Sequence, residues 1–324
     1  MNKKPILYDI KITTGIAIIL VVIGHLASRS EVGIDAYVNF KRIIYKFHMP
    51  LFLCLSGYIA YYTYPPIRSF KDYSIFVKKK VVRLFPAYII LSFVFLLGKY
   101  LFVNHTNVSE AIVDVLFYPS EGSSGFLWYL YVLFMYNLCM PFIDFAVRNY
   151  FLLIFIVSLV ISSFMPLPNL FSLDLFFWYL PFFLFGAYLD SKREVYVLSL
   201  QKYGVFALVL FIIWIPLEYM GLINVPKNII SFIAIVSFFY ISSIKIERNL
   251  FLEKIGDKSF YIYLFNTMFM GASSILFIKW LGRDVFYSKF YYFMPLLVII
   301  GVLLPILFHK YVISRIPVLK KMIK

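Results

Sequence analysis

Two histidines lie at the polar ends of long apolar runs near the start of the chain. His25 ends the run that begins at Gly15, and His48 opens the run that continues to Tyr58. An ionisable side chain inside a membrane span is costly, which makes each histidine a candidate functional residue. An imidazole titrates near neutral pH, so it can act as a general base or carry an acyl group. The alternative for each is a structural side chain hydrogen-bonded to a backbone carbonyl.

Other polar side chains that could bind a substrate lie in later apolar runs. A carboxylate there, Asp174 or Glu218, could orient a histidine or accept a substrate hydroxyl, or it could lie among lipid headgroups. Trp128 and Tyr129 follow a Gly/Ser segment and could form a platform for a sugar. The alternative for this aromatic pair is a belt at the membrane interface.

Basic residues gather between residues 68 and 83. Apolar positions recur there at helical spacing opposite the basic ones, which predicts an amphipathic helix at the membrane surface. Lys80 and Arg83 lie one turn apart, so they share a helix face and could clamp a phosphorylated donor. The same cations could instead anchor the helix to anionic lipid.

The composition is that of an integral membrane protein. Hydrophobic residues make up 62% of the chain, charged residues 15%, and the mean hydropathy is +0.86. Cys54 and Cys139 both fall in apolar runs and are expected to be buried thiols. The scattered histidines have no metal-ligand spacing, so no metal is expected. The net charge of +15 has no soluble basic domain to carry it, so nucleic acid is not an expected partner.

Apolar runs of about 20 residues predict an all-α protein with ten transmembrane helices. The fifth and sixth are separated only by residues 165–169, and a re-entrant pair is the alternative there. The remaining connections show no internal repeat and no linker, so residues 1–324 are expected to form one membrane domain. The expected spans are about 10–28, 44–63, 85–103, 126–146, 150–166, 170–189, 204–222, 228–246, 259–278 and 290–309.

Lysine and arginine in the connections predict the orientation of these spans. With the N-terminus inside, inner segments hold 21 of the 31 basic residues and outer segments hold 8. Positive charge favours the cytoplasmic side, so both termini are expected to be cytoplasmic. The first two spans then run in opposite directions, which places His25 and His48 at a similar depth in the outer leaflet.

Several stretches resemble the acyltransferase 3 family of membrane O-acyltransferases, in particular the branch that O-acetylates bacterial surface polysaccharides. The most specific is Phe47 to Gly57, which resembles the family's second-helix signature. The run from Gly15 to His25 resembles its first-helix motif. The segment that contains Lys80 and Arg83 resembles its cytoplasmic Arg-x-x-Arg segment. Further similar stretches are 127–130, 180–186 and 255–264.

The resemblance implies a multi-pass enzyme of a bacterial plasma membrane that uses acetyl-CoA, with acetyl as the default acyl group. Its acceptor would be a hydroxyl of a lipid-linked or surface glycan, and the polysaccharide biosynthesis machinery a possible partner beside the lipid bilayer. His25 would be the general base or the acyl carrier, and His48 would bind or orient. The donor phosphates would contact Lys11, Lys80 and Arg83; the substrate would contact Trp128, Tyr129, Asp174, Glu218 and Asn266.

Two positions depart from the family pattern. The basic position of the first-helix motif falls on Thr14, although Lys11 lies one turn earlier and could reach the same space. Near the end of the chain, Asn266 occupies a position where the family often has a histidine. These departures keep two other functions open, namely an inactive partner of a polysaccharide synthase and a glycan exporter or flippase without chemistry.

Overall fold

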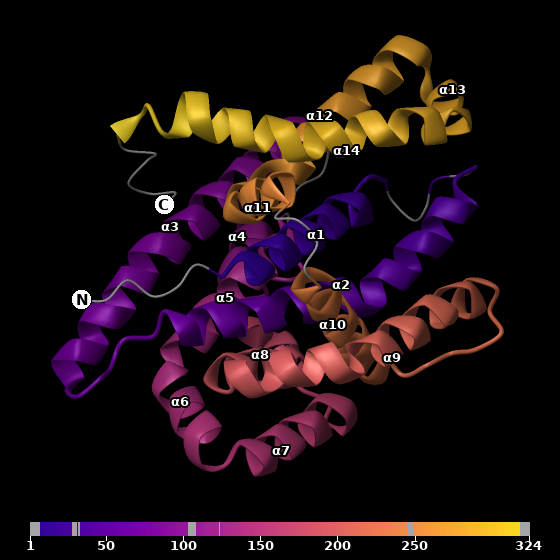
Figure 1. Ribbon diagram of the computed structural model, residues 1–324. Helices are drawn as coiled ribbons and strands as arrows, with labels where there is room; N and C mark the ends of the chain where they lie inside the picture. Colours follow the sequence, from indigo (N-terminus) through magenta and orange to yellow (C-terminus); the bar gives the residue numbers. More distant parts are fainter. Residues whose placement is uncertain are drawn as a thin grey trace. The chain divides into compact units, whose positions relative to one another are not determined.

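The computed structural model describes residues 7–27, 31, 33–102, 108–122, 124–244 and 249–317 (Figure 1). The secondary structure of these residues is helical, and the predicted all-α class is confirmed for them. The helices pack into two compact units: Met1–Leu55 with Lys192–Val312, and Ser56–Ser191 with Ile313–Lys324. The expected single membrane domain stays a prediction beside this division.

The first unit is organised around α1 (Tyr8–Gly24), which packs against α10, α11, α12 and α14. Two glycines allow the close approach of α1 and α11. A Cβ on Gly256 would lie 2.1 Å from Lys11 O, and one on Gly15 would lie 2.3 Å from Leu252 O. The other helices of this unit are α2 (Asp35–Tyr62) up to Leu55, α9 (Arg193–Tyr219), α10 (Lys227–Ser243), α11 (Leu250–Asp257), α12 (Ser259–Leu281), α13 (Arg283–Ser288) and α14 (Phe290–Phe308). The π-helical turn η3 (His309–Ile313) follows α14 and belongs to this unit up to Val312.

Ion pairs tie the helices of the first unit together at both ends of α1. Near its start, the Arg193 guanidinium lies 2.9 Å from the Asp9 carboxylate. Beyond its other end, Arg283 lies 2.9 Å from Glu31. These pairs join α1 to the start of α9, and the segment after α1 to the start of α13.

The second unit places α8 against α5, α6 and α7. Gly57, near the end of α2, lies so close to α8 that an added Cβ would be 2.1 Å from Phe183 O. The helices are α3 (Phe70–Phe102), α4 (Val108–Phe117), α5 (Trp128–Leu138), α6 (Met140–Asn149), α7 (Phe151–Phe164) and α8 (Leu173–Ser191), with the short 3₁₀ turns η1 (Gly125–Leu127) and η2 (Leu170–Ser172).

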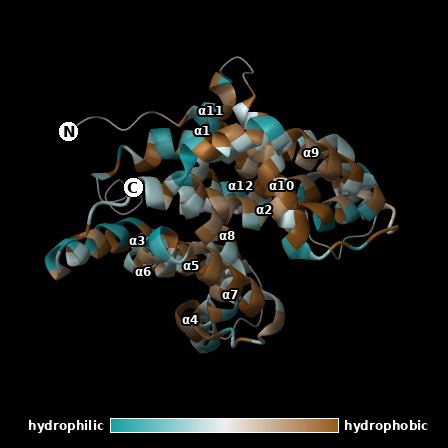
Figure 2. Cartoon of the chain, turned by 60° about the horizontal axis from the view of Figure 1, so that its bottom comes forward, coloured by the Kyte–Doolittle hydropathy of each residue, from teal (hydrophilic) through white to brown (hydrophobic). Residues whose placement is uncertain are grey.

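Six described helices are long and apolar enough to cross a membrane, or seven if the bent pair α5–α6 forms one span. Two further apolar helices, α7 and α10, have 14 and 17 residues. Ten spans and the cytoplasmic termini stay predictions, and residues 28, 103, 245 and 246 of the expected spans lie outside the described part. Figure 2 shows mostly hydrophobic helices, with hydrophilic residues along the first half of α3.

Three boundaries differ from the sequence prediction. The amphipathic segment and the third span form the single helix α3, because Pro86 is accommodated inside it. The helix α2 begins at Asp35, well before residue 44. The predicted span 126–146 is broken at Cys139 and bent by 65°. Pro141 explains this break, because it cannot donate the backbone hydrogen bond that would continue α5.

Candidate functional site

His25 directly follows α1 and is held there by the helix end. Its backbone N–H donates to Val22 O at 3.0 Å. The side chain is half-buried. Its ring lies edge-on to the Tyr45 ring, with 6.2 Å between the ring centroids. Within the described part of the chain the imidazole nitrogens have no hydrogen-bond partner, so they are available to a reacting group.

Three side chains from one face of α2 bind the carbonyl groups at the end of α1. The Tyr37 hydroxyl donates to Ile23 O at 2.9 Å, and the Tyr45 hydroxyl donates to Gly24 O at 3.1 Å. The Lys41 ammonium, which is buried, donates to Ala27 O at 2.7 Å. These donors satisfy carbonyls that have no partner inside a helix, and the Lys41 charge suits the negative end of the helix dipole. They therefore fix the segment that carries His25.

His48 lies on the same helix as these donors and is locked in place. It is only 3% exposed, and its Nδ1 lies 2.8 Å from Ile44 O. A carbonyl oxygen only accepts hydrogen bonds, so Nδ1 carries the proton and Nε2 is the accepting nitrogen of the neutral ring. The Tyr45 ring lies 4.7 Å from the His48 ring, centroid to centroid. The structure thus brings both histidines to the same tyrosine, and their common depth in the outer leaflet stays a prediction.

A proline two residues after His48 explains how α2 is joined to α10. Pro50 lies inside α2 and has no N–H to donate to the carbonyl of Lys46. The Ser231 hydroxyl of α10 lies 2.8 Å from that carbonyl oxygen and 2.6 Å from Lys227 O. A serine of the neighbouring helix thus takes the place of the missing backbone donor, which keeps the His48 segment helical.

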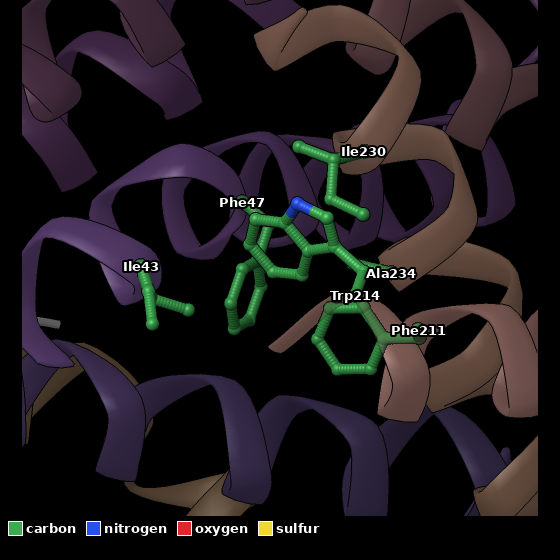
Figure 3. Packing of buried hydrophobic residues seen from close by; sticks show 6 residues of the cluster. All are labelled: Ile43, Phe47, Phe211, Trp214, Ile230 and Ala234. Atoms are coloured by element: carbon green, nitrogen blue, oxygen red, sulfur yellow. The ribbon is translucent and has the colours of Figure 1, made fainter. Parts of the chain in front are cut away.

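An aromatic cluster supports this part of α2 from behind. Phe47 packs edge-on against Phe211, with 5.1 Å between the centroids, and Trp214 lies 6.5 Å from it. Figure 3 shows these rings together with Ile230 and Ala234. Because Phe47 and His48 are neighbours, burial of the phenyl ring against α9 and α10 fixes the direction in which the imidazole points.

Glu218, predicted to bind substrate, lies in a buried ion pair beside this cluster. The Lys46 ammonium is 2.7 Å from Glu218 Oε1, and the Trp214 indole N–H donates to Oε2 at 3.2 Å. Lys46 also donates to Asn224 Oδ1 at 2.9 Å. Both carboxylate oxygens therefore have partners within the protein, which ties α2 to α9. A contact between Glu218 and the substrate stays a prediction.

The two residues considered for the basic position of the first helix have internal partners. The Thr14 hydroxyl is buried and donates to Ile10 O at 2.7 Å. The Lys11 ammonium lies 2.8 Å from Asp257 Oδ1. With a rise of about 1.5 Å per residue, Lys11 and His25 are roughly 20 Å apart along α1. Lys11 therefore does not contact His25, and its binding of the donor stays a prediction.

Asn266 lies in the middle of the first unit with one unused acceptor. It is 1% exposed, and its amide nitrogen donates to Ile262 O and Tyr263 O at 2.8 and 2.9 Å. These two bonds fix the amide, so that Oδ1 is left without a partner among the described residues. The adjacent Thr267 hydroxyl is in the same state. A buried acceptor of this kind suits a donor group of a ligand or a bound water.

In the second unit, the two predicted phosphate ligands share one side of α3. The Lys80 ammonium lies over the Phe76 ring, 5.2 Å from its centroid. Arg83 is exposed one turn later. The phenyl ring holds the ammonium close to the helix surface, which reduces the freedom of one of the two cations. Binding of a donor by this pair stays a prediction.

The predicted sugar platform is packed within the second unit. Trp128 is half-buried and stacks on Tyr179, with 5.0 Å between the centroids and 15° between the planes. Tyr129 is buried, and its hydroxyl lies 2.7 Å from Ser56 Oγ. The inner face of the indole is therefore covered, and only its remaining surface can meet a sugar.

Asp174 follows a strained turn at the start of α8. Phe171 and Ser172 have φ angles of 55° and 52°, which non-glycine residues rarely adopt. Ser172 Oγ and Asp174 Oδ1 are buried and have no hydrogen-bond partner in the part of the chain that the structure describes. Asp174 Oδ1 could accept a hydrogen bond from a hydroxyl donor, and a contact between Asp174 and the substrate stays a prediction.

The sequence analysis missed Tyr37, Lys41 and Tyr45 because it began the second span at residue 44, which left Tyr37 and Lys41 in the connection and separated them from Tyr45. Their spacing of four residues is a signal that was present, since residues four apart share a helix face. The helix was expected to begin too late for this face to be recognised.

Tyr45→Phe should lower the free energy of unfolding by about 1 kcal/mol, because Gly24 O loses its donor while the ring contacts remain. Thermal unfolding of the purified protein in detergent measures this change. Tyr292→Phe is the matched control, since Tyr292 is 85% exposed. Equal melting temperatures for the two variants would contradict a structural role for the Tyr45 hydroxyl.

A family model described as an acyltransferase domain, the acyltransferase 3 model, matches residues 7–315. This range includes both histidines and every other candidate residue named above. Neither the curated proteins nor the solved structures contain a match to the chain.

Proposed function

Because the chain belongs to the acyltransferase 3 family, we propose that it transfers an acetyl group from cytoplasmic acetyl-CoA to a hydroxyl of a surface or lipid-linked polysaccharide. Family membership makes it an acyltransferase, and the apolar helices make it a membrane protein. The observation that carries the proposal is the arrangement of His25 and His48 around Tyr45 at a capped helix end.

His25 is the general base in this proposal. Its ring is half-buried and its nitrogens are without partners among the described residues, so an acceptor hydroxyl can reach it. The imidazole takes the hydroxyl proton as the oxygen attacks the acyl carbonyl carbon, and the thiolate of CoA leaves with the electron pair of the broken C–S bond. A transient acyl-imidazole at His25 is the covalent form of the same transfer.

The neighbouring groups position this base. His48 is buried and has its Nδ1 proton committed to Ile44 O, so its Nε2 can accept a hydrogen bond from the acceptor. The cation Lys41 and the hydroxyls on α2 hold the helix end in one geometry. A fixed base avoids the entropic cost of orientation during the reaction.

The remaining predicted residues form the binding sites of the proposal. Within the second unit, Lys80 and Arg83 bind donor phosphates, and Trp128 and Tyr129 form the aromatic surface for the sugar. Lys11, in the first unit, is a further proposed contact of the donor. The unpaired oxygens of Asp174 and Asn266 support a role in binding acceptor hydroxyls, because such oxygens need donors. Glu218 stabilises the position of α2 through its ion pair with Lys46.

Mass spectrometry of the surface glycan from a deletion strain and its parent tests the proposed function. Loss of the acetyl groups with the glycan chain retained is the expected result. Loss of the whole glycan would favour an exporter, and an unchanged acetyl content would overturn the proposal.

A further inference from the structure

A cavity of about 370 Å³ lies in the first unit beside the start of α12. Its apolar walls come from Phe251 and Ile255 of α11 and from Leu303 and Ile306 of α14. Lys254 and Lys258 also line it, one turn apart. The volume lies at the lower end of the roughly 300–1,000 Å³ typical of ligand pockets, enough for a segment of hydrocarbon chain.

The charges around the cavity are not balanced. The one carboxylate in its lining, Asp257, is bound by Lys11 at 2.8 and 3.0 Å. Lys254 and Lys258 have no carboxylate partner among the described residues, and Lys258 lies 5.8 Å from the Tyr261 ring centroid. The cavity therefore combines apolar walls with two positive charges for which the described residues supply no counter-charge.

We propose that this cavity binds one anionic phospholipid, with its phosphate on Lys254 and Lys258 and an acyl chain along the apolar walls. Phe251 and Leu303 are 63% and 43% exposed, so hydrocarbon can reach both. Two neighbouring lysines beside an apolar surface match the charge and shape of an anionic headgroup above its chain. This binding is independent of the acyl transfer proposed above.

The chemistry of the lining favours a phospholipid over a soluble nucleotide-like anion. Apart from the two ammonium groups, the cavity walls offer apolar side chains and a carboxylate that is already paired. A nucleotide would bury many polar groups there without partners, which is costly. A hydrocarbon chain needs no such partners, and its burial is favourable.

The test uses the full-length protein in phosphatidylcholine nanodiscs with increasing phosphatidylglycerol, and counts bound phosphatidylglycerol by native mass spectrometry. The double variant Lys254→Gln/Lys258→Gln should bind it roughly 30-fold more weakly, since each lysine contributes roughly fivefold near a membrane surface. Lys254→Arg/Lys258→Arg should keep the binding. Leu303→Trp should weaken it by filling the cavity, although no charge is lost.

Lys78→Gln/Lys79→Gln is the matched control, because it removes the same charge from exposed positions of α3. It should change binding by less than about threefold if the cavity, and not general attraction of a basic surface, holds the lipid. Equal effects of the two double variants, or equal binding of phosphatidylcholine and phosphatidylglycerol, would overturn the proposal. Elution as a single species in size-exclusion chromatography confirms that each variant is folded.

Discussion

Replacing His25 with alanine is expected to lower the acyl-transfer rate at least about 100-fold, because a positioned general base contributes roughly 10² to 10⁴ in rate. Its half-buried ring lies beside Tyr45 at the end of α1. The next histidine in the sequence, His48, lies in α2 and cannot take its place at the end of α1. The acetyl content of the surface glycan, normalised to the amount of protein in the membrane, measures the effect in cells that lack the native copy.

Two further histidine variants serve as comparisons for His25→Ala. His48→Ala should also lower the rate, because the buried ring is hydrogen-bonded to Ile44 O and cannot be replaced by water without rearrangement. His309→Ala should leave the rate unchanged, since the His309 ring follows α14 and stacks on Tyr261 at the start of α12, away from His25. The centroids of these two rings are 3.5 Å apart. Wild-type glycan acetylation by His25→Ala at normal protein abundance would show that His25 is not the base.

The second large effect concerns the ion pair between α2 and α9. Lys46→Met is expected to lower the free energy of unfolding by about 3–5 kcal/mol, because it leaves the carboxylate of Glu218 buried without its counter-charge. The side chains of this pair are only 16% and 6% exposed, so water cannot replace the missing partner well. Chemical or thermal unfolding in detergent gives the change in stability.

A double-mutant cycle separates the ion pair from the packing around it. Lys46→Met/Glu218→Leu removes both charges and should be more stable than Lys46→Met alone, because no buried charge remains unpaired. Arg148→Met should lower the free energy of unfolding by less than Lys46→Met does, because the Arg148 side chain is 67% exposed beside Asp144. Additive losses in the double variant would mean that the two side chains act independently.

Much of the candidate site can be recognised in the sequence because membrane insertion is a local constraint. Each backbone group in hydrocarbon must be satisfied within its own segment, so long apolar runs become helices whatever surrounds them. The cost of a histidine in such a run identified His25 and His48 from their positions alone. Opposite directions of the first two helices, and a similar depth for the two histidines, are predictions from the same pattern, and in the structure each histidine ring lies beside Tyr45.

The partners of the polar residues could not be predicted in this way. Glu218 and Lys46 are 172 positions apart, and Lys11 and Asp257 are 246 apart, so only the packing of helices brings them together. Glycines allow that packing because they have no side chain. At Gly15 of α1 and Gly256 of α11, an added Cβ would collide with the backbone of the other helix. The early start of α2 is a further tertiary effect, because Tyr37, Lys41 and Tyr45 gain partners there only at the end of α1.

The sequence by itself therefore determined the helical membrane class, the family and the two histidines, because hydrophobic length and the cost of buried charge act along the chain. Only the tertiary structure decided which polar groups are engaged and which are open. It paired Glu218 with Lys46 and Lys11 with Asp257, and it capped the helix that presents His25. Among the described residues it left oxygens of Asp174 and Asn266 without partners. The physical reason is that hydrogen bonds and ion pairs require atoms within about 3 Å, a distance that helix packing alone sets.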